Sequence, residues 1–270
     1  ASPANLYEAQ ISAKVGNRVQ RSKRVTYGYR SIRFDKDTGF YLNGIHTKLK
    51  GVCVHHDGGC IGAAENRSAI ERQVDILTNM GCNAIRLTHN PFGAEYLDVC
   101  QRKGVLLVEE LFDCWTKSKK QKDFGRYFTD HYAEVVTSAI RRDWNNPAVI
   151  MWSLGNECKN PEILRTILVQ PYVNQMGETH VLHAYDPTRP WHYEQARDNF
   201  ATGIDVYSGM YETVEQMIAY AEAGHDTPYI ECEYEHAMGN AMGNMDEYQA
   251  AFDTLSLIHI SEPTRLLSIS

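Results

Sequence analysis

Two glutamates in this sequence each follow an apolar stretch that ends abruptly in ionisable residues. Glu157 closes the run Ala-Val-Ile-Met-Trp-Ser-Leu-Gly-Asn-Glu, and Glu233 closes the run Pro-Tyr-Ile-Glu-Cys-Glu. A stretch without polar positions, such as Ala148–Trp152, is typical of a strand buried on both faces of a parallel sheet. Two carboxyl groups at the carboxyl ends of such strands can divide acid/base and nucleophilic work on one bond.

The other predicted strands end in the same way. Polar or ionisable residues stand at seven strand ends: His55-His56-Asp57, Thr88-His89-Asn90, Glu109-Glu110, Asn156-Glu157, His192 and Glu194, Tyr207 and Tyr211, and Glu233. A single residue of this kind is more often a satisfied hydrogen-bonding group than a catalyst. Seven ends that converge on one mouth predict a catalytic site.

The elements that must position these residues alternate between strand and helix. Strands are predicted over 49–55, 82–88, 105–111, 148–157, 191–195, 204–207 and 228–234. Helices are predicted from a capping box at 68–71, over 94–102 with Gly104 as its cap, over 129–144, through a longer region to about 185, and over 213–223 and 245–254. This order predicts an α/β fold, a (β/α)8 TIM barrel over residues 36–254 that lacks its last unit.

The two ends of the chain differ in character from this barrel. Residues 1–35 alternate as a hairpin around Gly16-Asn17, which predicts the last strands of an antiparallel domain whose first strands lie upstream. Leu255–Arg265 resembles the translation of a transposase adapter used in DNA sequencing libraries, so residues 255–270 are predicted to be a non-native tail. The alternative is that Leu255–Ile260 is a genuine eighth strand that follows a helix with no loop.

Composition excludes some classes of partner. The 270 residues are 43% hydrophobic and 23% charged, as in ordinary globular proteins, and the net charge of -7 provides no basic face for nucleic acid. No apolar run reaches the roughly 18 residues that cross a bilayer. The seven cysteines form no CxxC pair and are predicted to be mostly buried free thiols. With no address signal, cytoplasm is the default expectation, and the full-length protein could form a homo-oligomer.

The chemistry that suits this mouth is cleavage of a glycosidic bond. One carboxyl group protonates the leaving oxygen while the other attacks the anomeric carbon, and Glu157 and Glu233 are the best pair for these roles. Polar groups would bind hydroxyls, and aromatic side chains such as Trp115 and Tyr211 would contact the substrate.

Residues from about 40 to 253 resemble the catalytic barrel of glycoside hydrolase family 2. One family signature is similar to Asn83–Pro91 continuing through Gly104–Leu107, and the other to Asp143–Pro147 continuing through Asn156-Glu157. The resemblance implies a TIM barrel with glycosidase activity. It also implies that residues 1–30 are the end of the family's immunoglobulin-like β-sandwich.

The resemblance extends to the roles of the two glutamates. The segment from Cys232 to Asn240 is similar to the nucleophile segment of the β-galactosidases rather than the β-glucuronidases. By that similarity Glu233 is the nucleophile and Glu157 the acid/base. A retaining mechanism requires their carboxyl groups to lie about 5 Å apart.

Sugar-binding residues are also implied by the resemblance. Asn156 would hydrogen-bond the sugar 2-hydroxyl and Tyr211 would lie beside the nucleophile. Other hydroxyls would be held by His89, by His236 and by one of His55 or His56. Glu194 matches a mouth position in the family or, equally well, pairs with Arg86.

The chain departs from the family at the metal site. Magnesium-dependent β-galactosidases have a Glu-x-His pair just after strand three, where this chain has Asp113-Cys114-Trp115. Only Glu157 of that metal site is left. The sequence therefore predicts no confident metal site and no other cofactor.

The expected function is a retaining exo-glycosidase that removes terminal β-D-galactose. The same chemistry on a β-glucuronide or a β-mannoside is the nearest alternative. A second alternative, from a different class, is an inactive truncated fragment with at most sugar binding, because a seven-stranded barrel leaves an open edge.

Overall fold

The computed structural model of the chain describes residues 5–173, 177–196, 203–236, 243–255 and 258–261. Its centre is a parallel sheet in the order β12-β9-β8-β7-β6-β15-β14-β13. In chain order these strands are β6 (Lys50–Val54), β7 (Ala84–Leu87), β8 (Leu106–Glu110), β9 (Val149–Ser153), β12 (Trp191–His192), β13 (Tyr207–Gly209), β14 (Tyr229–Glu231) and β15 (Ile258–Ser261). The two ends of the order meet where the backbone N–H of Asp205 donates to the carbonyl of Trp191 at 3.0 Å, so the sheet closes on itself.

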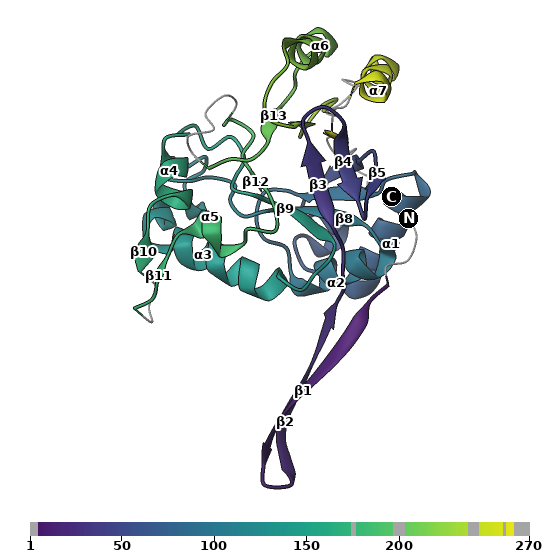
Figure 1. The fold of residues 1–270 in the computed structure, drawn as a ribbon. Helices are drawn as coiled ribbons and strands as arrows, with labels where there is room; N and C mark the ends of the chain where they lie inside the picture. The colour runs from purple at the N-terminus through teal and green to yellow at the C-terminus, as the bar shows by residue number, and fades with distance from the viewer. Residues whose placement is uncertain (1–4, 174–176, 197–202, 237–242, 256–257, 262–270) are drawn as a thin grey trace.

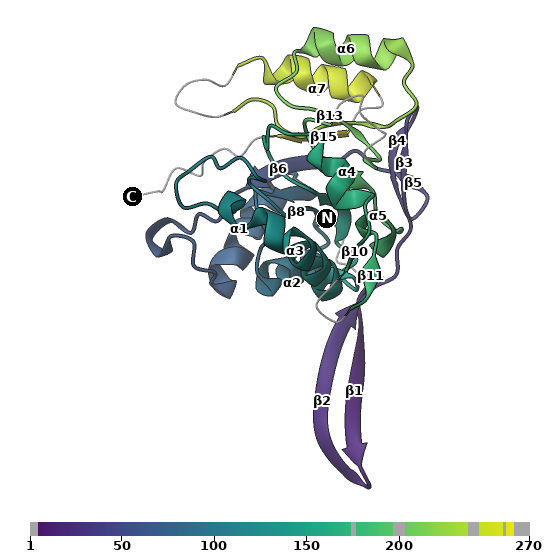
Figure 2. The ribbon, with the colours of Figure 1, turned by 90° about the vertical axis from the view of Figure 1, so that its left-hand side faces the viewer.

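Helices surround this sheet (Figure 1). They are α1 (Arg67–Asn79), α2 (Ala94–Lys103), α3 (Phe128–Asp143), α4 (Ile163–Leu168), α5 (Leu182–Tyr185), α6 (Val214–Ala223) and α7 (Met245–Thr254), with short 3-10 turns at Gly59–Ile61 and Phe124–Arg126. Figure 2 shows α6 and α7 side by side on one side of the sheet, with α1, α2 and α3 on the other. No described helix has the length and apolar character needed to cross a bilayer.

The inside of the barrel is apolar at the amino ends of its strands. Side chains from several strands meet there, among them Cys53, Ala84, Leu106, Val108, Ile150, Met151, Val206 and Ile230. Phe40 joins this cluster from the small antiparallel sheet of β3 (Ile32–Asp35), β4 (Gly39–Leu42) and β5 (Ile45–His46). That sheet therefore closes the amino end of the barrel with apolar side chains and leaves the carboxyl ends for polar ones.

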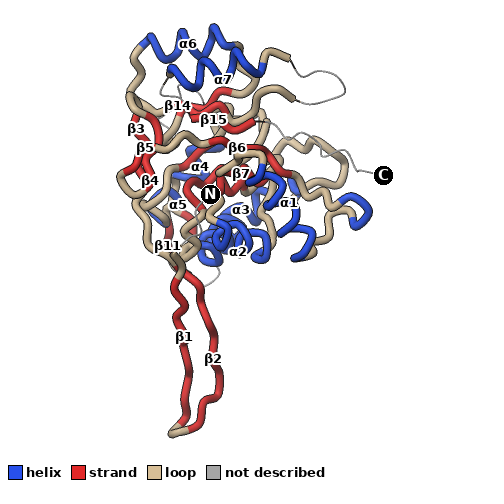
Figure 3. The backbone as a smooth tube through the Cα atoms, turned by 90° about the vertical axis from the view of Figure 1, so that its right-hand side faces the viewer, coloured by secondary structure: helices blue, strands red, loops and turns tan. Residues whose placement is uncertain are grey.

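The amino-terminal hairpin is formed by β1 (Tyr7–Val15) and β2 (Arg18–Tyr27), which pair in antiparallel fashion. Gly16 lies in its turn at φ 58°, a conformation that glycine adopts without strain. The hairpin projects away from the rest of the chain, and most of its side chains are exposed (Figure 3). The predicted hairpin is confirmed, whereas its origin in an immunoglobulin-like sandwich stays a prediction.

The expected absence of an eighth strand is wrong for the structure. β15 pairs in parallel with β14 on one side and β6 on the other. Both neighbours would otherwise present unpaired backbone groups, and the alternating Ile-His-Ile of this segment suits a strand. Lys48 holds the approach to β15, because its ammonium donates to the carbonyl of Leu255 at 2.7 Å. The adapter origin of residues 255–270 remains a prediction, and residues 262–270 lie outside the described ones.

Two other predicted elements also differ. The helical region expected up to residue 185 is broken into α4, a small sheet of β10 (Tyr172–Val173) with β11 (Thr179–His180), and α5. The first turn of α1 is capped by Asn66, whose side chain accepts from the N–H of Ala69 at 3.2 Å, instead of by the expected capping box. The Asn66 cap starts α1 at Arg67, one residue before the predicted box.

A buried ion pair fastens β12 to β9. Arg189 donates to Asp186 at 2.7 Å and to the carbonyl of Val149 at 2.8 Å, and both side chains are buried. The indole N–H of Trp152 donates to the same Asp186 carboxylate at 2.9 Å. The Asp-Pro-Thr-Arg-Pro segment, predicted to break a helix, therefore also fixes the position of β12 relative to β9.

We expect Arg189→Met to lower the free energy of unfolding by about 3–5 kcal/mol, because Asp186 would remain buried without its counter-charge. Urea unfolding followed by tryptophan fluorescence measures the change. Arg165→Met on the exposed side of α4 is the matched control and should change stability by less than about 0.5 kcal/mol. A loss at Arg189 no larger than that of the control would contradict this account.

Candidate active site

Above the apolar half of the barrel lies a polar layer centred on Arg86. Its side chain is fully buried on β7, where an inward position follows from the alternation with Ile85 and Leu87. The guanidinium donates to Glu110 from Nη2 at 2.6 Å and to the amide oxygen of Asn156 at 3.1 Å, and it forms an ion pair with Glu233. One cation thus links four segments that are far apart in the sequence.

Glu110 is the second fixed charge of this layer. Its carboxylate accepts from Arg86, from the hydroxyl of Ser153 at 2.7 Å, and lies 2.5 Å from Nδ1 of His89. Burial by itself would raise the pKa of this carboxyl group, but the charge of Arg86 and the bond to His89 outweigh it and hold the pKa well below its usual range. Glu110 is therefore an ionised acceptor that orients Arg86 and His89.

Glu233 lies at the carboxyl end of the barrel, two residues after β14. Its side chain is nearly buried, and the hydroxyl of Tyr211 donates to its second carboxylate oxygen at 2.8 Å. The backbone N–H of Tyr211 also donates to the carbonyl of Glu233 at 2.8 Å, so the two residues hold each other at both ends. Nε2 of His89 lies 4.0 Å from the carboxylate. Glu231, two residues earlier on β14, faces outward toward Tyr229 and Glu212.

The histidines separate into two groups. The rings of His55 and His89 lie 5.1 Å apart, and His236 meets Tyr211 at 6.3 Å. His56 instead packs on Phe92, with ring centroids 3.7 Å apart. His55 is therefore the member of the pair that belongs to the mouth. Residues 237–240 of the predicted nucleophile segment lie outside the described residues.

His192 fills the floor of the polar layer. Its two ring nitrogens meet the hydroxyls of Ser153 at 2.9 Å and Ser208 at 2.8 Å. Burial lowers its pKa to about 3, with the charge of Arg86 as a further cause, so the ring is neutral at physiological pH. His192, which was predicted at a strand end, thus adds no charge to the layer.

The sequence predicted Glu157 at the end of a strand over 148–157. In the structure β9 ends at Ser153, and Glu157 lies in the loop that follows. Three successive backbone N–H groups of this loop donate to side chains that follow β12: Glu157 to Glu194, Cys158 to Tyr193 at 3.0 Å, and Lys159 to Gln195 at 3.2 Å. The Glu157 backbone is at φ 47°, and its side chain is 47% exposed. The backbone of Glu157 is therefore fixed, whereas its carboxyl group is open to water.

Glu194 was expected either to line the mouth or to pair with Arg86, and its contact with the Glu157 backbone gives it a different role. The side chain is buried and accepts from the N–H of Glu157, whereas the bonds of Arg86 go to other residues. Burial raises the pKa of Glu194 to about 8, and the bond from Glu157 opposes that rise. Glu194 is thus an anchor of the loop that carries Glu157.

Trp115 does not line the mouth, contrary to expectation. It is fully buried, its indole N–H donates to the carbonyl of Leu154 at 2.9 Å, and its ring packs on Tyr193 with centroids 4.4 Å apart. Gly155 makes room for this packing, since a Cβ there would meet the indole nitrogen at 3.1 Å. Trp115 supports the loop of Glu157 from below and cannot contact a sugar in this arrangement.

Two of the predicted strand ends also point away from the mouth. Glu109 faces outward on β8 and receives a bond from Arg142 at 3.1 Å. Tyr207 packs outside the sheet against Tyr220, with ring centroids 4.3 Å apart. Residues one position apart on a strand face opposite sides, so only one of each adjacent pair can reach the mouth.

Sequence reasoning named Arg86 only as a possible partner of Glu194, and it missed Lys119. The signal for Arg86 was available, because a charge inside the apolar run Ala-Ile-Arg-Leu has to be paired when the strand is buried. Lys119 gave no such signal, since it stands in a lysine-rich polar stretch that is typical of solvated loops. Its ammonium nevertheless lies 3.9 Å from the carboxylate of Glu157.

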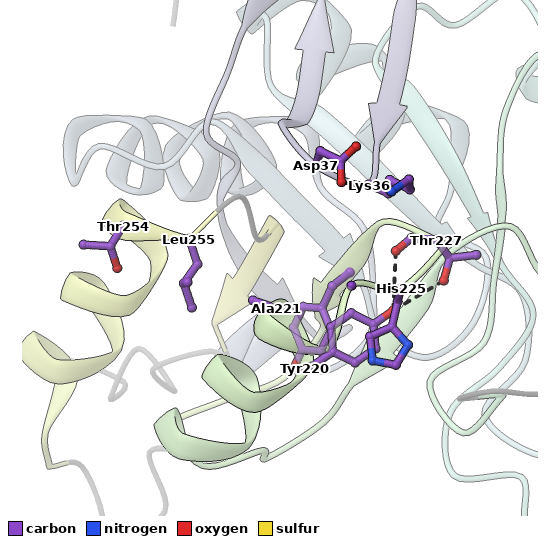
Figure 4. Close-up of a pocket in the computed structure, with 10 residues that line it drawn as sticks. Lys36, Asp37, Tyr220, Ala221, His225, Thr227, Thr254 and Leu255 are labelled. Atoms are coloured by element: carbon purple, nitrogen blue, oxygen red, sulfur yellow. Dashed lines mark hydrogen bonds and ion pairs between the residues drawn. The ribbon is translucent and has the colours of Figure 1, made fainter.

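Two cavities of the described residues lie away from this layer. One of about 260 Å³ is lined by Lys36, Asp37, Tyr220, Ala221, Gly224, His225, Thr227, Tyr229, Thr254 and Leu255. In Figure 4, Tyr220 reaches Thr227 through hydrogen bonds, while Lys36 and Asp37 come from the turn between β3 and β4. A second cavity of about 350 Å³ lies beside Pro190 and Pro228, before β12 and β14. Both belong to the amino ends of the strands and contain none of the predicted site residues.

Comparison with known proteins agrees with this arrangement. The sequence profile described as "Glycosyl hydrolases family 2, TIM barrel domain" matches residues 35–259. Beta-galactosidase BoGH2A of Bacteroides ovatus is 50% identical over 130 residues, which cover 48% of this chain and 15% of that protein. A protein of Formosa agariphila, provisionally named a beta-glucuronidase, is 40% identical over 154 residues, or 57% of this chain and 15% of its own length.

Among solved structures, a glycosyl hydrolase family 2 member from Bacteroides cellulosilyticus superposes with a TM-score of 0.80 at 31% identity. The superposition covers 95% of this chain and 32% of that one. The matches thus cover only about a sixth to a third of the length of these relatives.

The raised pKa of Glu194 predicts a pH-dependent stability. Between about pH 4.5 and pH 8 the folded state keeps a proton that the unfolded chain has lost, so the free energy of unfolding falls as the pH rises. One such proton corresponds to about 1.4 kcal/mol per pH unit. We expect Glu194→Gln to remove this contribution, as measured by urea unfolding at pH 5, 6, 7 and 8.

Glu231 provides an independent comparison, because burial raises its pKa to about 8 as well. The double variant with Glu231→Gln should therefore show a flatter profile than either single variant. A slope in Glu194→Gln that equals that of the parent protein would contradict the prediction.

Proposed function

Because the chain belongs to glycoside hydrolase family 2, we propose that it carries the catalytic centre of a retaining exo-glycosidase that releases terminal β-D-galactose. Family membership implies a glycoside as the substrate and hydrolysis as the reaction. The observation that carries the finer proposal is the pairing of a clamped carboxylate, Glu233, with a half-exposed one, Glu157, at the same end of the barrel.

Glu233 has the surroundings of a nucleophile. Arg86 and the Tyr211 hydroxyl each bind one of its carboxylate oxygens, which holds the group in one orientation. An ionised, immobile carboxylate is what attack on an anomeric carbon requires, since less motion is lost on reaching the transition state. We assign the covalent glycosyl-enzyme bond to this residue.

Glu157 has the surroundings of an acid/base catalyst. Its side chain is open to water, which lets it exchange the proton that it gives to the leaving oxygen and later takes from the attacking water. Its backbone N–H is bound by Glu194, so the exposed carboxyl group can rotate while the backbone stays fixed. The two glutamates thereby divide the chemistry in the way that retention demands.

The remaining polar side chains of the mouth would bind the sugar. Asn156 is fixed by Arg86 beside Glu233, which suits a hydrogen bond to the 2-hydroxyl next to the anomeric carbon. His89 is oriented by Glu110, and its other nitrogen faces the nucleophile. His55 and His236 stand next to His89 and Tyr211, where further hydroxyls would lie.

The β-galactoside assignment is supported by the nucleophile segment and by the 50% identity to Beta-galactosidase BoGH2A. A β-glucuronide is the second candidate, because the relative from Formosa agariphila is 40% identical over a slightly longer stretch. The test compares 4-nitrophenyl β-galactoside and 4-nitrophenyl β-glucuronide as substrates of the gene product that carries these residues. Faster turnover of the galactoside supports the proposal, and faster turnover of the glucuronide replaces it.

The stereochemistry is tested on the same protein. Retention predicts that proton NMR detects the β-anomer of the free sugar first, before mutarotation. Initial release of the α-anomer would overturn the double displacement. An absence of turnover on both aryl glycosides would favour the interpretation as an inactive fragment.

We expect Glu233→Gln to abolish turnover, whereas Glu231→Gln, on the outward face of β14, should keep most of the activity. We expect Glu157→Ala to lower kcat about 10²–10⁴-fold, the usual contribution of an acid/base group. Azide should partly restore Glu157→Ala and yield the β-glycosyl azide, because a small nucleophile needs no base. Equal losses in Glu231→Gln and Glu233→Gln would mean that the effect is structural.

A further inference from the structure

A lysine reaches the acid/base carboxyl group from the loop that follows β8. Nζ of Lys119 lies 2.8 Å from Oδ1 of Asp113 and 3.9 Å from Oε2 of Glu157. The Lys119 side chain is 23% exposed, less than either carboxylate that it approaches. An ordinary surface lysine would extend into water instead.

The loop that carries Lys119 is built to hold this position. The carboxylate of Asp123 accepts from the backbone N–H of Lys120 at 2.7 Å and of Gly125 at 3.0 Å, which closes the loop on itself. At its start, buried Trp115 bonds to the carbonyl of Leu154 in the loop that leads to Glu157. The two loops are therefore fastened together beneath the ammonium group.

Lys119 carries its charge under physiological conditions. Burial alone would lower its pKa, but the bond to Asp113 and the nearby carboxylate of Glu157 raise the pKa above its ordinary value. The ammonium group is thus a permanent cation beside the proposed acid/base residue.

The same place is where magnesium-dependent relatives would hold their ion, and the residues here do not fit one. Cys114 and Trp115 are buried and offer no oxygen ligand, and the Asp113 carboxylate is already paired with Lys119. No group of three His, Cys, Asp or Glu side chains in the described residues is arranged to hold a metal ion. Magnesium prefers a near-octahedral set of oxygens, and a neighbouring ammonium would repel it.

We propose that Lys119, fixed by Asp113, is the resident cation of this site and positions the Glu157 carboxyl group for proton transfer in place of a divalent ion. The inference rests on the proposed function. Lys119 is a positioning residue, because it acts on the substrate only through Glu157. Its charge draws the exposed tip of Glu157 toward one side of the mouth, while Glu194 holds the backbone.

The test separates positioning of Glu157 from general support of the fold. Departure of a poor leaving group needs the proton of Glu157, whereas 2,4-dinitrophenolate leaves without one. We expect Lys119→Met to lower kcat/KM on phenyl β-galactoside about 10–100-fold and to leave kcat/KM on 2,4-dinitrophenyl β-galactoside almost unchanged, since misplacement of a catalytic group by about 1 Å can cost about 10²-fold. Lys119→Arg keeps the charge and should recover most of the loss.

Lys120→Met is the matched control, because Lys120 is exposed on the same loop, and it should behave as the parent protein on both substrates. A chelator should not change the parent activity, and added magnesium should not change the melting temperature. Equal losses of Lys119→Met on both substrates, no loss at all, or inactivation by the chelator with recovery on magnesium would each overturn the inference.

The outcomes also distinguish this inference from the proposed function. If the parent protein turns over no aryl β-galactoside, the proposed function itself fails. If the parent is active and Lys119→Met matches Lys120→Met, only the role of Lys119 fails. Should the β-glucuronide prove to be the substrate, the same pair of leaving groups on that sugar applies.

Discussion

The carboxyl end of this barrel depends on a single buried cation, Arg86. An unpaired guanidinium inside a protein is very costly, so its position on β7 requires anionic partners from neighbouring segments. Glu110 and Glu233 supply the charge, and Asn156 supplies a further acceptor. The requirement that stabilises Arg86 is also the one that gathers the site, since its partners come from β8, the end of β14 and the loop after β9.

Two layers inside the barrel make this arrangement possible. The amino half is filled with apolar side chains and closed by Phe40. The polar half begins one step higher, with His192 as a neutral floor between hydroxyls. Charges in such surroundings are weakly screened, so each must be satisfied by a fixed partner, and the result is a rigid set of hydrogen bonds.

The proposed acid/base residue is treated differently from the proposed nucleophile. Glu233 is held through its carboxylate, whereas Glu157 is held through its backbone and keeps an exposed tip. Glu194, Trp115 and Lys119 converge on its loop from three directions. An acid/base catalyst has to change its protonation state in each cycle, and contact with water serves that need better than a buried ion pair.

Local patterns in the sequence were sufficient for much of the fold. The bounds of α7 and the Gly104 cap of α2 depend on residues within one or two turns, and both were predicted correctly. The position of Glu233 does not follow from such a local rule, because strand alternation would put it on the same outward face as Glu231. Glu233 reaches Arg86 and Tyr211 because the chain leaves β14 after Glu231.

The tertiary structure decided the contacts between segments that are distant in the chain. Four such contacts depend on which loops and strands lie side by side. They are the pairing of β15 between β14 and β6, the position of His55 rather than His56 near His89, the burial of Trp115, and the approach of Lys119 to Glu157. The sequence by itself determined the family and the order of the first seven barrel strands, since these follow from motifs and short-range periodicity. The pair Glu157 and Glu233 was predicted from the same motifs. Only the folded chain decided which polar side chains meet, because a charge is placed by the partner that lowers its energy, and that partner lies up to 147 residues away.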